Sequence, residues 1–270
     1  MKKIVISSVL TALLASNLFA KDVSSYEYAP LKSNTEVKSA LSNNGFSVIG
    51  EYDAMQNPNY HVVAFTNTAM KNAASQENRG FVGVQKVLID KKDNTLVFTN
   101  PEYFMHAFLQ DNFKDNIAQE INAKLSAAFG KMIGSKDALE DDDIAGYHFM
   151  MAMPYYEDMI EIGEGADLVQ KIKKNAGKNL VFELKLKNST LLGVAMPSKQ
   201  GEAYYLPKIK GEKHAAFLPY MILVQNNKAE IMHPKYYLAI AFPKLSMGEF
   251  MAISATPGDI EDYMTGLLAK

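Results

Sequence analysis

NPEYFMHAFL, at residues 100–109, is matched in chemical character by HPKYYLAIAF, at residues 233–242. Each stretch follows a strand-like apolar run, and Asn100 is a residue that caps helices well. Pro101 and Pro234 then stand at the first helical position, where the missing N–H of proline costs nothing. Two equivalent helix starts in one chain of 270 residues predict an internal duplication.

The same alignment predicts which aromatic side chains are buried. Tyr103 falls on Tyr236, and Phe104 falls on Tyr237. A helix that packs on a sheet buries the large residues on its inner side. We therefore expect Tyr103 and Tyr236 to be core residues at equivalent places, each against the sheet of its own copy.

Hydrophobic periodicity on either side of these stretches predicts the order β-α-β-β-β-β-α twice. In the first copy a strand at 26–28 precedes a helix at 33–45, whose cap is Asn34 or Thr35. After residue 100 the helical pattern continues to residue 129, with a break near Asp111. The second copy has a strand-rich entry at 147–163 and a helix that ends at Gly177. The predicted strands are 46–54, 61–67, 81–90 and 95–99 in the first copy and 180–186, 190–196, 220–225 and 229–233 in the second.

These elements predict an α+β protein made of two tandem β-α-β4-α domains. Each domain is expected to be an antiparallel sheet with helices on one face, and the two domains to form an intrachain pseudo-dimer. The predicted boundaries are 21–130 for the first repeat, 131–147 for a solvated linker that contains EDDD, and 148–270 for the second repeat.

Several of these segments together resemble the domain of unknown function 302 family. The resemblance is carried by ALSNNGFSVIGEYDA, VLIDKKDNTLVFTNP and EYFMHA in the first half, and by FLPYMILVQNNKAEIMHP in the second. The chain departs from the family at Thr66–Thr68, where the family prefers Gly-Asn-Pro, and at Gly83–Val84, where it has the Leu-Pro found here at Leu218–Pro219. The resemblance implies a TATA-binding-protein-like β-α-β4-α fold, and it implies no activity because the family has none established.

The first twenty residues have the pattern of a secretory signal peptide. Lys2 and Lys3 precede the apolar run Ile4–Leu14, which is shorter than the roughly 20 residues that span a bilayer, and cleavage is expected after Ala20. The pattern predicts a protein exported to the periplasm, with no membrane span once the signal is removed.

Composition narrows the classes of function. The absence of cysteine excludes disulfides and thiolate chemistry. Without the two signal lysines, 26 basic residues face 30 acidic ones, a net charge of −4 that argues against nucleic acid as a partner. Arg79 is the only arginine, so bidentate recognition of phosphate is nearly absent.

One segment has metal-ligand chemistry. HFMMAM contains His148, Met150, Met151 and Met153, and imidazole with thioether suits Cu(I). On the predicted strand, His148 and Met150 would point to one face and Met151 and Met153 to the other. We therefore predict that these weak candidates bind no metal. We identify no catalytic residue and expect no cofactor.

Two functional hypotheses stay open. The first and favoured one is a non-catalytic binding or envelope-associated module whose partner is an unknown periplasmic protein or small ligand. The alternative is a small-molecule or copper-handling protein with its site between the repeats. Under this hypothesis the protein could be an enzyme or a binding protein. Polar and histidine side chains converging between the repeats would favour the alternative. In either case the pseudo-dimer allows the chain to be a monomer.

Overall fold

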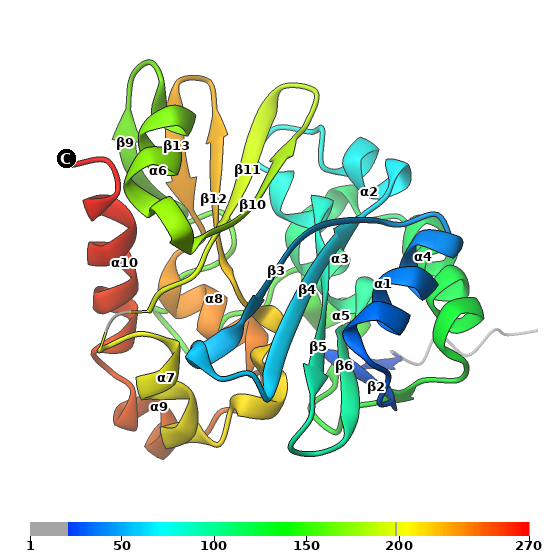
Figure 1. Ribbon diagram of the computed structural model, residues 1–270. Helices are drawn as coiled ribbons and strands as arrows, with labels where there is room; N and C mark the ends of the chain where they lie inside the picture. Colours follow the sequence, from blue (N-terminus) through cyan, green and yellow to red (C-terminus); the bar gives the residue numbers. More distant parts are fainter. Residues whose placement is uncertain (1–20, 198, 270) are drawn as a thin grey trace, which may run out of the picture.

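The computed structural model describes residues 21–197 and 199–269, so the predicted signal peptide lies outside the described residues. The protein is a mixed α/β structure in which all strand pairs are antiparallel (Figure 1). We call residues 21–147 the first half and 148–269 the second half. Within the described ranges, no helix is long and apolar enough to cross a membrane.

The larger sheet belongs to the first half. Its strands, in spatial order, are β3 (Ser47–Asp53), β4 (Tyr60–Thr66), β5 (Gln85–Asp90), β6 (Thr95–Thr99), β2 (Tyr26–Pro30) and β7 (Ile133–Gly134). The second sheet runs β10 (Leu180–Lys185), β11 (Ser189–Val194), β12 (Tyr220–Gln225), β13 (Lys228–Ile231) and β9 (Ile160–Glu164). A small ribbon pairs β1 (Asp22–Val23) with β8 (Leu139–Glu140).

Apart from β7, the two sheets have the same strand order when their strands are counted along the chain. In both, the first strand of the sheet along the chain (β2 or β9) lies beside the fifth (β6 or β13), and the second (β3 or β10) forms the opposite edge. This is the order that the predicted duplication requires. The duplication itself stays a prediction, since a common topology does not require a common origin.

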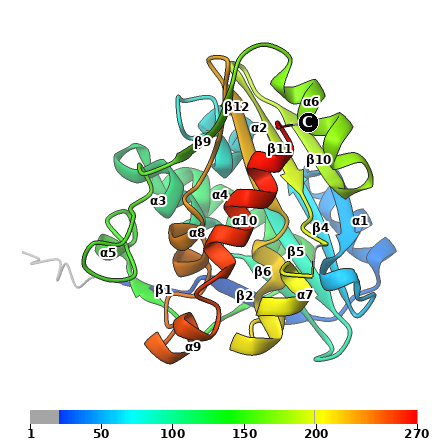
Figure 2. The same ribbon diagram turned by 90° about the vertical axis from the view of Figure 1, so that its left-hand side faces the viewer.

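Helices connect and cover the sheets. They are α1 (Asn34–Asn43), α2 (Thr68–Ala73), α3 (Pro101–Leu109), α4 (Asp115–Phe129), α5 (Asp141–Ile144), α6 (Leu168–Ala176), α7 (Glu202–Tyr205), α8 (Pro234–Ala241), α9 (Met247–Ala252) and α10 (Thr256–Gly266). Short 3₁₀ segments are η1 (Ala54–Gln56), η2 (Gly80–Gly83), η3 (Gln110–Asn112), η4 (Gly177–Asn179), η5 (Leu206–Ile209) and η6 (Glu212–Phe217). Figure 2 shows α10 lying along the second sheet, where it contacts β9 and α8.

The predicted helix starts are present. Pro101 and Pro234 each open a helix that follows a β-hairpin, and the side chains of Asn100 and His233 cap these helices. The cap of α1 is Ser33, one residue before the predicted position, because its hydroxyl and the Glu36 carboxylate form a capping box.

Two predicted segments differ in the structure. Residues 147–158 form turns and bends instead of a strand, and β9 begins only at Ile160. Met151 is 93% exposed and Ala152 has a left-handed φ of 65°, so this segment has no buried alternating face. The segment 131–147 is not a free linker either, since β7 extends the first sheet by pairing with Tyr28 in β2.

The two halves meet along their edge strands. β3 and β10 lie next to each other (Figure 1), and each has an irregular register with its own neighbour. A Cβ at Gly50 in β3 would stand 2.1 Å from the carbonyl oxygen of Val181 in β10. Only glycine permits this approach, so Gly50 fixes how closely the edges can pack.

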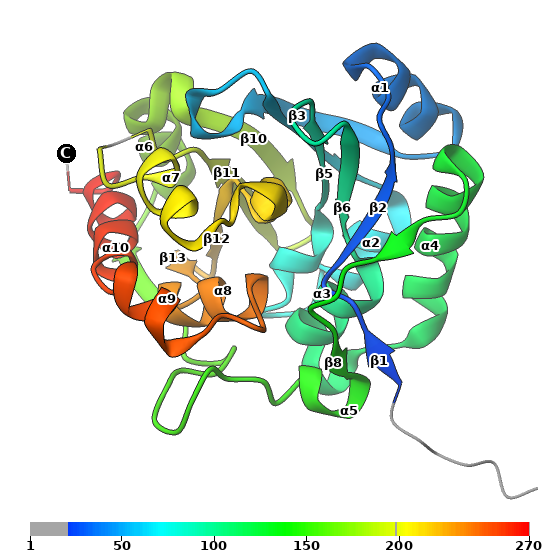
Figure 3. The ribbon, with the colours of Figure 1, turned by 90° about the horizontal axis from the view of Figure 1, so that it is seen from below.

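Each half also covers the sheet of the other. The η6 segment of the second half contacts β4, β5 and β6, and the η2 segment of the first half contacts β11 and β12. In the view from below, the yellow segment that contains η6 lies between the two sheets (Figure 3). As a result, all six residues of β5 are buried.

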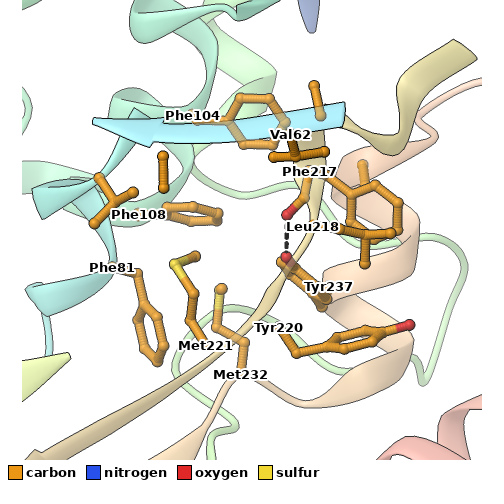
Figure 4. Packing of buried hydrophobic residues seen from close by; sticks show 14 of the residues in the cluster. Val62, Phe81, Phe104, Phe108, Phe217, Leu218, Tyr220, Met221, Met232 and Tyr237 are labelled. Carbon is orange, nitrogen blue, oxygen red and sulfur yellow. Dashed lines mark hydrogen bonds between the residues drawn. The ribbon is translucent and has the colours of Figure 1, made fainter. Parts of the chain in front are cut away.

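The core between the halves is aromatic and contains paired tyrosine hydrogen bonds. Phe81, Phe104 and Phe108 of the first half approach Met221 and Phe217 of the second (Figure 4). In this region the hydroxyl of Tyr103 in α3 donates to the carbonyl of Ile240 in α8 at 3.0 Å.

The reciprocal bond runs from Tyr236 in α8 to the carbonyl of Ala107 in α3 at 3.3 Å. Tyr103 is 0% and Tyr236 1% exposed, so both are core residues, as expected. Their hydroxyls bind the opposite helix and so join the two halves, a role beyond the predicted packing of each tyrosine on its own sheet.

Candidate functional site

The largest cavity among those described lies where the second half covers the end of the first sheet. Its volume is about 760 Å³, within the usual range of ligand pockets. We call it the His214 cleft. It is lined by Tyr28, Asp90, Asp93, Thr95, Val97, Ile133, Gly134, Ser135, Lys136, Asp137, Lys213, His214 and Lys244.

The floor of the cleft is one face of the first sheet. Tyr28 in β2 stands opposite both Val97 in β6 and Ile133 in β7, and Asp90 in β5 stands opposite Thr95 in β6. Directly opposed residues on neighbouring strands project to the same face, and so do residues two apart on one strand. Strand register therefore places these side chains together.

His214 comes from η6 and forms the opposite wall. Its ring stacks on Tyr26, with 4.4 Å between ring centroids, and lies 6.0 Å from the ring of Phe242. Its Nε2 is 2.9 Å from the hydroxyl of Tyr28. These contacts hold the imidazole in one orientation, while 21% of its side chain stays exposed.

Asp137 lies on the other side of the imidazole. One of its carboxylate oxygens accepts a hydrogen bond from the Ser135 hydroxyl. The other, Oδ2, is 3.8 Å from His214 Nδ1, too far for a hydrogen bond, and has no partner among the described residues. A carboxylate facing Nδ1 favours the tautomer with its proton there, so that Nε2 accepts the hydroxyl proton of Tyr28.

The electrostatic surroundings keep this pair of side chains neutral. Burial lowers the pKa of His214, and the opposing charge of Asp137 offsets only part of that effect. Burial, followed by the charges of Asp137 and Asp93, raises the pKa of Tyr28 to about 12. At neutral pH the cleft therefore presents an uncharged imidazole and a protonated phenol.

The order of contacts bears on the chemistry. A hydrolytic triad places histidine between serine and the carboxylate. Here Asp137 lies between Ser135 and His214, and His214 then reaches Tyr28. Ser135 therefore contacts a carboxylate and has no adjacent imidazole base, so the arrangement is suited to hydrogen bonding a ligand rather than to activating a serine.

Lys86 is a second buried ionisable group, and it lies away from the cleft. Its Nζ donates to the carbonyl of Phe217 at 2.5 Å and approaches that of Pro219 at 3.4 Å. Burial lowers the pKa of Lys86 to about 7. The cavity beside it measures only about 10 Å³, so Lys86 has no room for a ligand.

Glu202 is a third such group, where the two halves join near β3 and β11. It accepts hydrogen bonds from the Tyr52 hydroxyl at 3.1 Å, from the Met55 amide at 3.1 Å and from the Met196 amide at 3.2 Å. Burial raises the pKa of Glu202 to about 7 despite these donors. Because the protein itself supplies these donors, Glu202 links the halves structurally.

The metal candidates from the sequence lie in the irregular segment before β9. His148 Nδ1 is 3.3 Å from the Gly146 carbonyl, and its ring lies 4.3 Å from that of Tyr155. The Met153 amide closes a turn on the Met150 carbonyl at 2.9 Å. Because this segment is not a strand, the side chains do not alternate between two faces as predicted. The prediction that they bind no metal is therefore no longer supported by alternation, and it stays a prediction. In the described residues, no three His, Cys, Asp or Glu side chains form a metal-binding group.

Sequence reasoning did not single out the residues that line the cleft. Tyr28 and His214 are 186 positions apart, and no local motif surrounds either of them. Only the register of β2, together with the placement of η6 on the first sheet, brings them together. The only sequence feature that pointed to the cleft was His214, in the long segment between the strands β11 and β12.

Comparison of the chain with protein-family models, with curated proteins and with solved structures gives no match. The resemblance to the domain of unknown function 302 family therefore stays a prediction from the sequence.

Proposed function

We propose that the protein binds a small ligand in the His214 cleft, as an exported, non-catalytic binding protein. The observation that carries the proposal is the hydrogen-bonded pair of Tyr28 and His214, partly exposed in a cavity of about 760 Å³. Buried polar groups in a protein interior are normally satisfied by protein or water. Polar groups that converge on a cavity are the usual mark of a ligand site.

The position of the cleft supports this proposal. Tyr28 comes from the first half and His214 from the second, so polar groups converge between the halves, as the small-molecule hypothesis requires. Elsewhere the halves meet through the packed aromatic core around Phe217 and through the hydrogen bonds of Glu202. A ligand in the cleft would touch both halves and would stabilise their association.

A thermal-shift screen of the purified protein tests the proposal. We expect at least one of benzoate, benzylamine, glucose and inorganic phosphate to raise the melting temperature, because a ligand that binds only the folded state stabilises it. Tyr28→Phe removes one hydroxyl and should weaken that ligand severalfold, as the loss of a hydrogen bond of about 0.5–1.5 kcal/mol does.

Tyr155→Phe is the matched control, because Tyr155 is 47% exposed and lies outside the cleft. It should leave the ligand shift unchanged. A screen in which none of the four compounds shifts the melting temperature contradicts the proposal. So does a shift that Tyr28→Phe and Tyr155→Phe reduce equally.

One observation favours a second candidate, the envelope-associated module. Met247 and Met251 lie one turn apart on α9 and are 45% and 60% exposed. A ring contact of 5.0 Å between Phe149 and Phe250 brings the exposed Met151 segment beside this helix. Flexible methionine side chains suit an apolar segment of a partner protein. Met247→Ser with Met251→Ser should then abolish co-purification of that partner from the envelope fraction, whereas Tyr28→Phe should not.

A further inference from the structure

We propose that the ligand of the His214 cleft is a small organic carboxylate with an apolar body. The inference rests on the proposed function and names the class of ligand for the same site. Two observations support it. Lys136 and Lys244 are exposed charged groups of the cleft, and Ile133 is an exposed apolar side chain beside them.

Each acidic side chain of the cleft has a contact within the protein, although the second carboxylate oxygens of Asp90 and Asp137 are buried without a partner among the described residues. Asp93 forms an ion pair with Lys213 at 2.5 Å. Asp90 is fully buried, and one of its oxygens accepts the amides of Lys92 and Asp93 at 3.0 Å each. Asp137 is held by the Ser135 hydroxyl, and its free oxygen is buried against His214.

Two lysines of the cleft are differently placed. Lys136 follows β7 and Lys244 follows α8, so they reach the cleft from the two halves. Both are exposed, and neither forms an ion pair within the described ranges. The exposed charges that a ligand can reach are therefore those of the two lysines, whereas the carboxylate oxygens of Asp90 and Asp137 that lack a partner are buried, and this exposed positive charge favours an anion.

The cleft also has an exposed apolar surface. Ile133 is 69% exposed, although it lies in β7 directly opposite Tyr28. The partly buried ring of Tyr28 continues this surface across the floor of the cleft, and Val97 beside it is fully buried. An anion with an apolar body would cover Ile133, whereas an inorganic anion would leave it in water.

The exposed Ile133, rather than the kind of donor, favours an organic carboxylate over inorganic phosphate. Arginine pairs bidentately with carboxylate and phosphate alike, whereas lysine acts as a point charge towards either. The only arginine, Arg79, pairs with Glu157 at 2.7 Å and does not line the cleft. Two single-point lysine cations, one from each half, can meet one carboxylate group.

Calorimetric titration of the purified protein with benzoate, benzylamine and inorganic phosphate tests the inference. We expect benzoate to bind and the other two not to bind. Lys136→Gln and Lys244→Gln should each weaken benzoate about two- to fivefold, the range for exposed ion pairs. Ile133→Ser should weaken it further, through the loss of apolar contact.

Lys174→Gln is the matched control, because Lys174 is exposed on α6 and does not line the cleft. It should leave benzoate affinity unchanged. Binding of benzylamine or inorganic phosphate without benzoate would overturn the carboxylate class but leave the proposed function standing. Binding of benzoate with equal affinity to all the lysine variants would also overturn it. Failure of every compound would overturn both.

Discussion

The paired tyrosines between α3 and α8 permit a sharp test of how the halves are joined. Truncating Tyr103 or Tyr236 to alanine removes a side chain that is 0% or 1% exposed, together with one hydrogen bond between the halves. Tyr103→Phe and Tyr236→Phe remove the hydrogen bond alone. The two kinds of variant separate the packing contribution from the polar one.

The expected magnitudes follow from these contacts. Replacing a buried aromatic side chain by alanine costs about 3–5 kcal/mol, because it loses apolar burial and leaves a cavity. Loss of a hydroxyl donor alone costs about 0.5–1.5 kcal/mol. Each alanine variant should therefore lose at least about 3 kcal/mol in the free energy of unfolding, and each phenylalanine variant about 1 kcal/mol.

Urea unfolding followed by circular dichroism measures these changes, and Tyr204→Ala serves as control because Tyr204 is 47% exposed. The control should stay within about 0.5 kcal/mol of wild type. If Tyr103→Ala and Tyr236→Ala unfold like wild type, these tyrosines are not core residues. If only one of them is destabilised, the reciprocal contact does not join the halves as the structure indicates.

Further predictions concern buried charge, export and metal. In the folded protein the pKa of Glu202 is raised from 4.5 to about 7, so protonated Glu202 stabilises the fold fully below pH 4.5. About 3 kcal/mol of the free energy of unfolding should be lost as the pH rises to 7. A Glu202→Gln variant whose melting temperature depends on pH in the same way as wild type contradicts this. Lys86→Met should raise the free energy of unfolding by about 1–4 kcal/mol, more at pH 6 than at pH 9, because the lowered pKa of Lys86 shows that the fold disfavours its charge. A variant that melts at a lower temperature than wild type at pH 6 would count against it. The mature protein should begin near Lys21 on N-terminal sequencing, and recovery of the intact chain from the cytoplasm would refute export. Elemental analysis after cuprous loading should find no stoichiometric copper, whereas one tightly held ion lost on changing Met151 and Met153 would show a site.

Local signals predicted the hairpins and helix starts well. Asn94, Asn226 and Asn227 all adopt positive φ in the turns where the sequence indicated hairpins. Pro101 and Pro234 open helices as expected. Such features depend on the conformational preferences of single residues, which a sequence shows directly.

Long-range packing explains the parts that the sequence did not predict. The strand expected near Met151 is absent because no neighbouring strand pairs with that segment and Met151 itself is exposed to water. Nothing close to His214 in the sequence indicates that η6 crosses to the other sheet. The Tyr28–His214 contact results from that crossing, so neither composition nor periodicity could reveal it.

The crossed placement of η2 and η6 has a consequence for how the chain comes apart. If either half were removed, the remaining sheet would expose a face of valine, leucine and lysine side chains built to meet the other half. When only the first half has been synthesised, the face of its sheet that η6 covers is still exposed to water. Folding must wait for synthesis to pass residue 217, and a protease that cuts the segment between the halves would leave two fragments held together without a peptide bond.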